Sequence, residues 1–388
     1  MSRMKLIKST IALFVMSSMM FTMACSNNTN NEQQNNNTTT KVEEEKGPYD
    51  DLKIGVVNIG SSTDSSGYTF AHTNGIKGMM SALNLRNDQV IYKDNVPDDA
   101  PDTIRDAIKN CINKGCKIIF TTSYGFQEVT YEMAEKYPSV YFSHCSGKMS
   151  NGKNMNRYFG RIYQPFYLAG IAAGLKTKTD KIGFVSAFGT AVSESAYCLN
   201  AFAMGVESVN KKAKVITRVI NCWDDEKKER TAAEKLVKAG VDVIGQDTDS
   251  SMPQKVAEEN NIYGVGYNND MRKDAPNATL VSVIWNWEKY YTDTVKDICA
   301  DNWDVQNYYG GLKEGIVDIT ELSELNDKKA EKKIKDVVKM FNEGTWDVFN
   351  GKIVTNTGKT IGENNVALSG DEIQFNINWL YKNIKVDK

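Results

Sequence analysis

Short apolar runs alternate with amphipathic helical stretches from residue 52 onward, and this alternation constrains the fold more than any other feature of the chain. Strands are expected at LKIGVVNI (52–59), KIIFTT (117–122) and SVYFSH (139–144). A helix is expected over residues 101–115, because this stretch starts with proline and ends with glycine. Strands that are apolar throughout and separated by helices predict an α/β fold with parallel sheets covered on both faces.

A second series of the same kind begins after a turn at residues 176–181. Its expected strands are KIGFVSAF (181–188), KVITRVINCW (214–223), VDVIGQ (241–246) and IYGVGY (262–267), with helical patterns between them. Two such series predict two Rossmann-like lobes, and the 338 residues after residue 50 exceed the usual size of one core. We expect lobe 1 at 51–165 plus about 286–320 and lobe 2 at 166–285 plus about 321–388, with hinge crossovers between them.

The first 24 residues have the parts of a bacterial lipoprotein signal peptide. A basic head precedes an apolar run over residues 11–21, which would span only about 16 Å as a helix, too short for a bilayer core of ~30 Å. Cys25 follows the small residue Ala24 and is the expected lipidation site. Residues 25–50 are polar and predict a disordered tether on the extracytoplasmic side of the cell membrane. An ordinary signal peptide that happens to contain a cysteine is the alternative.

The composition excludes several classes of partner and cofactor. Without the three basic signal residues, 44 Lys and Arg face 49 Asp and Glu, a net charge of about −5, and no long basic block is present. Nucleic acid and anionic lipid are therefore poor partners. The chain has 2 His and 7 Cys with no CxxC pair, so neither a zinc site nor any other cofactor is expected. The six cysteines after Cys25 are interpreted as buried thiols, with disulfides as the alternative.

Several separated segments together resemble the basic membrane protein family of solute-binding lipoproteins, which feed ABC importers. These segments are residues 166–187, 229–270, 283–295 and 308–317, in order along the chain. The resemblance implies a type I periplasmic-binding-protein fold, in which two lobes close over a ligand. It also implies a purine nucleoside or a related small metabolite as the ligand. The first loop, SSTDSSGYTFAH (61–72), departs from the pattern of the family's nucleoside binders.

Candidate ligand contacts follow from the rule that ligands lie beyond the carboxyl ends of parallel strands. Aromatic rings at these ends can stack on a flat ligand, and carboxylates can accept its hydrogen bonds. For each aromatic residue the alternative is packing in the hinge core. The candidates are Asp64, Tyr68, Tyr124, Phe126, Phe188, Trp223, Asp249, Asp270 and Trp285.

Two of these aspartates have more specific expectations. Asp270 in GYNND occupies the position at which, by the resemblance, family members place a ligand-binding aspartate. Asp249 is the second candidate, and its alternative role is N-cap of the following helix. Arg161 and His72 are assigned structural roles in the hinge and in helix packing.

No catalytic motif is present: the chain has no GxSxG, no GxxxxGK[ST] and no HExxH. The sequence therefore predicts a solute-binding protein that captures a purine nucleoside or purine base and delivers it to an ABC permease. An exported enzyme of the nucleoside hydrolase type and a surface receptor or adhesin are the alternatives.

Overall fold

The computed structural model describes residues 47–387, and these belong to one compact unit. The expected signal peptide, Cys25 and most of the expected tether lie outside the described residues. The tether was expected to continue to residue 50, but Tyr49 packs against the core and its carbonyl accepts the Gln89 side-chain amide at 2.6 Å. Within residues 47–387, no helix has both the length and the apolar character needed to cross a bilayer.

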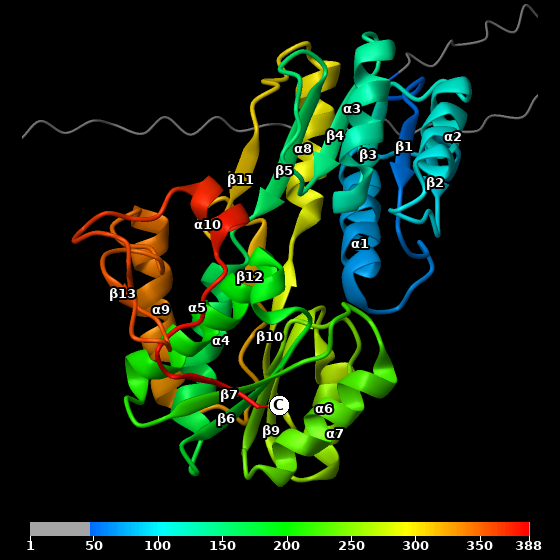
Figure 1. Ribbon diagram of the computed structural model, residues 1–388. Helices are drawn as coiled ribbons and strands as arrows, with labels where there is room; N and C mark the ends of the chain where they lie inside the picture. The colour runs from blue at the N-terminus through cyan, green and yellow to red at the C-terminus, as the bar shows by residue number, and fades with distance from the viewer. Residues whose placement is uncertain (1–46, 388) are drawn as a thin grey trace, which may run out of the picture. The chain divides into compact units, whose positions relative to one another are not determined.

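The first lobe is built on a parallel sheet in the order β11-β5-β4-β3-β1-β2 (Figure 1). Its strands are β1 (Ile54–Val57), β2 (Val90–Lys93), β3 (Ile118–Thr121), β4 (Tyr141–Cys145), β5 (Met155–Gly160) and β11 (Tyr308–Gly310). Its helices are α1 (Gly67–Ala82), α2 (Pro101–Asn113), α3 (Gln127–Lys136) and α8 (Trp287–Cys299). Every residue of β1 and β3 is buried, as expected for strands that are covered on both faces.

The second lobe repeats this plan with the order β12-β10-β9-β8-β6-β7-β15. Its strands are β6 (Lys181–Ser186), β7 (Lys214–Val219), β8 (Val243–Gln246), β9 (Tyr263–Asn268), β10 (Thr279–Trp285), β12 (Val317–Ile319) and β15 (Ile384–Val386). Its helices are α4 (Tyr163–Lys176), α5 (Ser193–Val209), α6 (Glu226–Lys238) and α7 (Met252–Glu259). All pairings are parallel except that of β10 with β12. The predicted α/β fold class is confirmed.

The chain passes between the two sheets after β5, after β10 and after β11. Since β12 pairs with β10, the chain is back in the second sheet by Val317. A C-terminal segment follows, with α9 (Lys328–Glu343), β13 (Ile353–Val354), β14 (Thr360–Ile361) and α10 (Gly370–Asn376). β13 and β14 form an antiparallel hairpin around Asn-Thr-Gly.

Glycines allow α4 and α5 to pack at backbone contact in the second lobe. A Cβ at Gly170 would lie 2.1 Å from the Phe202 carbonyl oxygen, and one at Gly205 would lie 2.1 Å from that of Tyr167. No side chain fits at either position. This close contact fixes α5, whose first turn reaches the space between the lobes.

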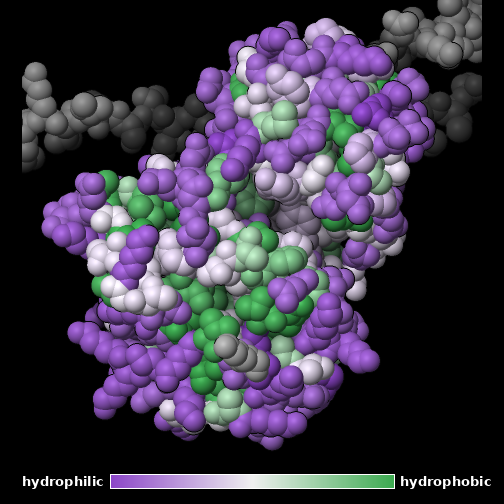
Figure 2. All heavy atoms as spheres, viewed as in Figure 1, coloured by the Kyte–Doolittle hydropathy of each residue, from purple (hydrophilic) through white to green (hydrophobic). Residues whose placement is uncertain are grey.

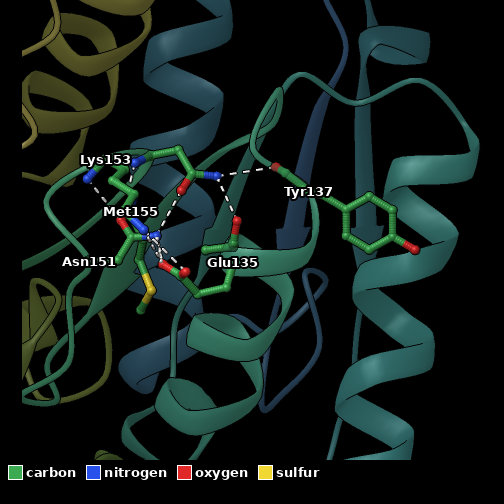
Figure 3. Close-up of polar contacts among 7 residues, drawn as sticks. Glu135, Tyr137, Asn151, Lys153 and Met155 are labelled. Carbon is green, nitrogen blue, oxygen red and sulfur yellow. Dashed lines mark hydrogen bonds and ion pairs between the residues drawn. The ribbon is translucent and has the colours of Figure 1, made fainter.

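The end of the first sheet that lies away from the second lobe is closed by a polar turn before β5 (Figure 3). The Asn151 side-chain oxygen accepts the backbone N–H groups of Lys153 and Met155 at 3.0 and 2.9 Å. Its amide donates to Glu135 at 3.0 Å, which ties the turn to the end of α3. This end of the sheet is thus a structural anchor.

The surface view shows a different chemistry in the middle of the same face. Hydrophilic residues cover most of the upper lobe and the outer rim, whereas hydrophobic residues gather over the middle of the lower, second lobe (Figure 2). Large exposed hydrophobic residues include Ile59 and Tyr124, which are 38% and 53% exposed. Both follow first-lobe strands at the carboxyl end, the end where a ligand is expected.

Candidate ligand-binding site

The strand order of each sheet creates a crevice at the carboxyl ends of two neighbouring strands. In the first lobe these strands are β1 and β3, and the Tyr68 hydroxyl from α1 donates to the carbonyl of Thr122, directly after β3, at 2.6 Å. In the second lobe they are β6 and β8. Asp247, directly after β8, accepts the N–H of Ala187, directly after β6, at 2.7 Å. One side chain therefore bridges each crevice: Tyr68, a candidate from the sequence, in the first lobe, and Asp247 in the second.

The two crevices meet at the first turn of α1. Gly67 has φ +79°, and a Cβ built on it would lie 3.1 Å from the Asp249 Cβ. Its N–H donates to the Asn269 side-chain oxygen at 3.4 Å. A left-handed φ and a close neighbour both favour glycine here. This contact brings lobe 1 directly onto the carboxyl ends of β8 and β9.

Tyr68 forms the first-lobe wall of the site. Its ring packs edge-on against His72 with centroids 4.5 Å apart, and its hydroxyl lies 3.4 Å from the Cys145 sulfur. Burial raises the Tyr68 pKa well above its usual value. His72 is fully buried, its Nδ1 lies 2.6 Å from the Tyr291 hydroxyl, and burial lowers its pKa to about 3. The structural role expected for His72 agrees with this environment.

Phe188 and Trp223 form an aromatic pair on the second lobe. Their ring centroids lie 5.2 Å apart at 67°, and both residues are half-buried. Trp223 was expected at the end of a strand, but β7 ends at Val219 and Trp223 lies in the turn that follows. Its carbonyl accepts the Asp249 N–H at 2.9 Å. The pair therefore lies next to Asp249.

Asp249 lies at the contact between the lobes, against Gly67, and is not a helix cap. The N-cap of α7 is Ser251, so the alternative role considered for Asp249 is wrong. Its carboxylate accepts the Asn268 side-chain amide at 2.6 Å. Burial, followed by the nearby carboxylates of Asp224 and Glu229, raises the Asp249 pKa well above its usual value. The raised pKa favours the protonated carboxyl, which can donate one hydrogen bond to a ligand as well as accept others.

Trp285 supports Asn268 from the hinge. Its indole N–H donates to the Asn268 side-chain oxygen at 3.1 Å, and its ring stacks on Trp287 at 4.6 Å and 11°. Trp285 is buried. Its observed contacts position Asn268, and a direct ligand contact stays a prediction.

Asp270 lies with Trp285 and Asn268 on an interlobe groove of about 660 Å³ beside α1 and α8. Its carboxylate accepts the Arg272 Nε at 2.8 Å and the Arg272 backbone N–H at 3.1 Å. These bonds to Arg272 lower the Asp270 pKa. Asp270 is thus engaged within its own turn, and its role as a ligand contact stays a prediction.

Of the three remaining candidates, one is buried in the core and two are exposed at the surface. Phe126 is fully buried in the core beneath α2 and α3, so its assignment to the site is corrected to a core residue. Tyr124 is exposed, and Asp64 is exposed in the loop after β1, where it accepts the Ser61 N–H at 3.0 Å. The strand-end rule placed Phe126 at the correct edge but could not say that its ring turns inward.

Arg161 has the structural role that was expected. Its guanidinium lies 3.6 Å from the Asp347 carboxylate and donates through Nε to the Tyr309 carbonyl at 3.0 Å. It therefore ties β11 at the hinge to the C-terminal segment. The cysteines of the described part are free thiols.

Glu194 is a site residue that the sequence analysis missed. It is half-buried on the first turn of α5, and the Tyr267 hydroxyl donates to its Oε1 at 3.5 Å. Burial and then the Asp247 carboxylate raise the Glu194 pKa to about 8. Glu194 could have been found as an acidic residue that follows β6. It was missed because a short helical turn, Gly189–Ala191, separates it from the strand end.

The second-lobe edge of the site is acidic and uncompensated. No cation contributes to the raised pKa values of Glu194, Asp247 and Asp249, and burial is the largest cause for each. Within the described residues, no cluster of His, Cys, Asp and Glu has the arrangement needed to hold a metal ion. The site therefore favours ligands that donate hydrogen bonds and are neutral or positively charged.

Two similar α/β lobes with facing crevices and a hinge of crossovers define the class of two-lobed solute-binding proteins. Residues 52–345 match the Bmp family, described as "ABC transporter substrate-binding protein PnrA-like". The chain belongs to this family, which confirms the resemblance found in the sequence and the expectation of a binding protein rather than an enzyme.

Relatives and solved structures agree with this assignment. The chain is 33% identical over 307 residues to a purine-binding protein of Brucella abortus, covering 79% of this chain and 83% of the relative. It is 27% identical over 266 residues to the ABC transporter nucleoside-binding protein BmpA of Lactococcus lactis, covering 62% and 71%. An ABC transporter solute-binding protein from Conexibacter woesei has the same fold, with a TM-score of 0.62 and 14% identity over 76% of this chain and 98% of that one.

Proposed function

We propose that this protein captures a purine nucleoside or purine base between its lobes and delivers it to an ABC permease. Closure follows if the ligand contacts both lobes, because it then binds the closed state better than the open one. The names of the Brucella and Lactococcus relatives support this ligand class.

One arrangement carries the proposal: Tyr68 from lobe 1 and the Phe188–Trp223 pair from lobe 2 flank Asp249. Gly67, next to Tyr68, is in contact with Asp249, and Asp249 bonds to the Trp223 backbone. A flat heteroaromatic ring could stack on these side chains, at about 1–3 kcal/mol per stacking partner. Asp249 would then accept a ring N–H or an exocyclic amine.

The same acids argue against phosphorylated ligands. A nucleotide would bring negative charge to an acidic edge, where burial first and then the Asp224 and Glu229 carboxylates already raise the Asp249 pKa. Uncompensated like charges at close range destabilise a complex. The proposal therefore covers nucleosides and bases and not nucleotides.

Isothermal titration calorimetry on the detergent-purified protein tests this proposal. Adenosine, guanosine, adenine and AMP are titrated separately. We expect one-site binding of at least one unphosphorylated purine and no measurable heat with AMP. Binding of AMP as tight as that of adenosine would contradict the charge argument, and silence with all purines would contradict the ligand class.

We also propose that the protein is held at the extracytoplasmic face of the membrane by a lipid on Cys25. The basic head, the short apolar run and the cysteine after Ala24 support this. Metabolic labelling with a fatty-acid analogue is expected to mark the wild-type protein and not Cys25→Ala. Equal labelling of the two proteins would remove Cys25 as the lipidation site.

A further inference from the structure

Two buried cysteines lie side by side where α2 ends and the chain turns into β3. Cys111 is on the last turn of α2 and has no exposed surface, and Cys116 is 2% exposed shortly before β3. Both belong to the hydrophobic core beneath α2 and α3, and the structure holds them as thiols. The proposed binding site uses neither residue, so their pairing needs a separate explanation.

The backbone at the end of α2 has the hydrogen bonds of a Schellman motif. The Cys116 N–H donates to the Cys111 carbonyl at 3.1 Å, and the Gly115 N–H donates to the Ile112 carbonyl at 2.9 Å. Gly115 has φ +86°, the left-handed conformation on which this motif depends. The motif commonly brings the side chains of the two residues that share its outer bond into contact. Here those residues are Cys111 and Cys116.

The two thiol groups are direct neighbours. The hydrogen bond with Cys116 is the largest cause that lowers the Cys111 pKa, and the same bond is the largest cause that raises the Cys116 pKa. The positive charges of Lys93 and Lys114 also lower the Cys111 pKa. The Cys111 thiol points as well toward the Ile91 carbonyl, at 3.9 Å. Side-chain contact therefore agrees with the backbone motif.

The first sheet leaves room for the Cys111 sulfur. A Cβ on Gly55 of β1 would lie 2.8 Å from the Cys111 Cβ and 2.9 Å from its sulfur, so a side chain at this position would displace the thiol. Within the described residues, no further His, Cys, Asp or Glu completes a metal site around the two sulfurs. The pair is thus shaped for sulfur chemistry between its own two members.

The backbone already meets the geometric requirement of a disulfide. Bridged cysteines have Cα atoms about 4.4–6.8 Å apart. Residues joined by a backbone hydrogen bond are about this far apart, as in hydrogen-bonded strand pairs at about 5.5 Å. Because the Cys111 sulfur is shielded from solvent, oxidation has to take place while the chain folds, before α2 closes over β1.

We propose that Cys111 and Cys116 form a stabilising disulfide that cross-links the end of α2 to the start of β3 when the chain folds in the presence of a disulfide oxidant. Each cysteine loses its proton to solvent. One thiolate attacks a sulfur of the oxidant's disulfide and expels a thiolate, and the other then attacks the mixed disulfide and expels the second. The cysteine pair is oxidised by two electrons, and the oxidant is reduced by two electrons to two thiols.

The proposed extracytoplasmic location would supply such an oxidant, because disulfides form and persist outside the cytoplasm. The cross-link does not depend on which ligand the protein binds. Its test therefore needs one sample that reports the cell's own redox conditions and one that supplies the oxidant in the test tube.

Peptide mapping of the detergent-purified full chain tests the bond. Cells are lysed in iodoacetamide, and the protein is unfolded in urea with more iodoacetamide and digested with trypsin without reductant. Cleavage after Lys109, Lys114 and Lys117 places the two cysteines on separate peptides, residues 110–114 and 115–117. We expect mass spectrometry to find these two peptides joined and to find them separate after reduction.

A second sample is reduced, unfolded and refolded in a buffer of reduced and oxidised glutathione before the same mapping. Both peptides fully alkylated in both samples would overturn the disulfide. Joined peptides in the refolded sample alone would support the disulfide and contradict the proposed oxidising location. Joined peptides in the cell-derived sample support both.

Two controls show whether the pairing is specific. Cys198 is equally buried, but only burial and two carboxylates shift its pKa, so its peptide is expected to be alkylated in every sample. Cys111→Ala should leave Cys116 alkylated. A bond from Cys116 to any other cysteine in wild type would overturn the assignment.

Thermal scans with and without a phosphine reductant test the stabilising role. The cross-link limits the freedom of the unfolded chain, so reductant should lower the unfolding temperature of the joined wild-type protein by roughly 2–6 °C. The double variant Cys111→Ala with Cys116→Ala should unfold at one temperature under both conditions. An equal shift in the double variant, or no shift in the joined wild type, would overturn the stabilising role.

Discussion

The two lobes share one strand order, yet their cleft edges differ in chemistry. In the first lobe the Tyr68 hydroxyl is paired with the Thr122 carbonyl, and the Ser143 hydroxyl lies 2.7 Å from that of Tyr290. In the second lobe Glu194 and Asp249 carry raised pKa values because burial is not offset by any cation. The first edge is a satisfied, preformed wall, and the second is an acidic surface that a ligand would complete.

Equivalent positions in a repeated fold can therefore serve different roles, stability on one edge and ligand binding on the other. Residues that are already satisfied contribute to stability, and their removal leaves a buried group unpaired. Buried acidic residues without a cationic partner lower the stability of the free protein, and a ligand that hydrogen-bonds to them offsets this loss. Mutations on the two edges should therefore have opposite signatures in stability and in binding.

The largest effect is expected where the two edges touch. Gly67→Val would place branched atoms against Asp249, and overpacking at about 1–3 kcal/mol would oppose closure. We expect affinity for the cognate purine to fall by up to about 100-fold. Gly115→Val is the matched control, because Gly115 also has a positive φ but nothing lies within 4 Å of its Cβ position. Equal purine affinities of the two variants by calorimetry would show that the Gly67–Asp249 contact does not control closure.

The next effect contrasts one residue from each edge. Asp249→Asn should gain thermal stability relative to wild type as the pH rises, since the raised pKa means that ionising the buried carboxyl is unfavourable, and it should weaken purine binding roughly tenfold. Tyr68→Phe should instead lower the unfolding free energy by about 1–3 kcal/mol, because the Thr122 carbonyl loses its donor. It should not weaken purine binding, because the aromatic ring is kept. Thermal scans and titrations of both variants check this. If both variants lost stability, the two edges would not divide the tasks as argued.

A pH dependence of intermediate size follows from Glu194. Its pKa is raised from 4.5 to about 8 in the folded state, so the folded protein holds a proton that the unfolded chain releases. Its contribution to stability is therefore present below about pH 4.5 and is lost as the pH rises to about 8. Chemical denaturation from pH 5 to pH 9 should show Glu194→Gln gaining stability over wild type as the pH rises. A constant difference across this range would place Glu194 in a solvated environment.

The smallest effect concerns a contact that spans the lobes outside the site. Arg157 of β5 pairs with Asp371 of α10 at 2.7 Å and lies over the Phe375 ring at 4.9 Å. The Asp371 side chain is 73% exposed, so solvent screens the pair to about 0–1 kcal/mol, and Arg157→Ala should weaken purine binding by no more than a few-fold. Arg230→Ala is the control, because Arg230 pairs with Glu259 within the second lobe. Equal affinities in the two variants would show that α10 does not assist closure.

The sequence predicted the fold well because the apolar periodicity of strands and helices is a local signal. It predicted the edge at which the site lies for the same reason, since the ends of strands are visible in the pattern. It misplaced Phe126 because the inward turn of a ring depends on how α2 and α3 pack over it. It missed Glu194 because the contact of the α5 start with Tyr267 of β9 joins residues that are far apart in the sequence, which no local pattern reveals.

The most direct test of the central claim is to identify what the cell has already loaded into the cleft. The protein is purified without added ligand and denatured, and the released small molecules are analysed by mass spectrometry. We expect a purine nucleoside or base in near-equimolar amount, and less of it in Asp249→Asn purified in parallel. Recovery of a non-purine metabolite in equimolar amount, or of a nucleotide, would contradict it.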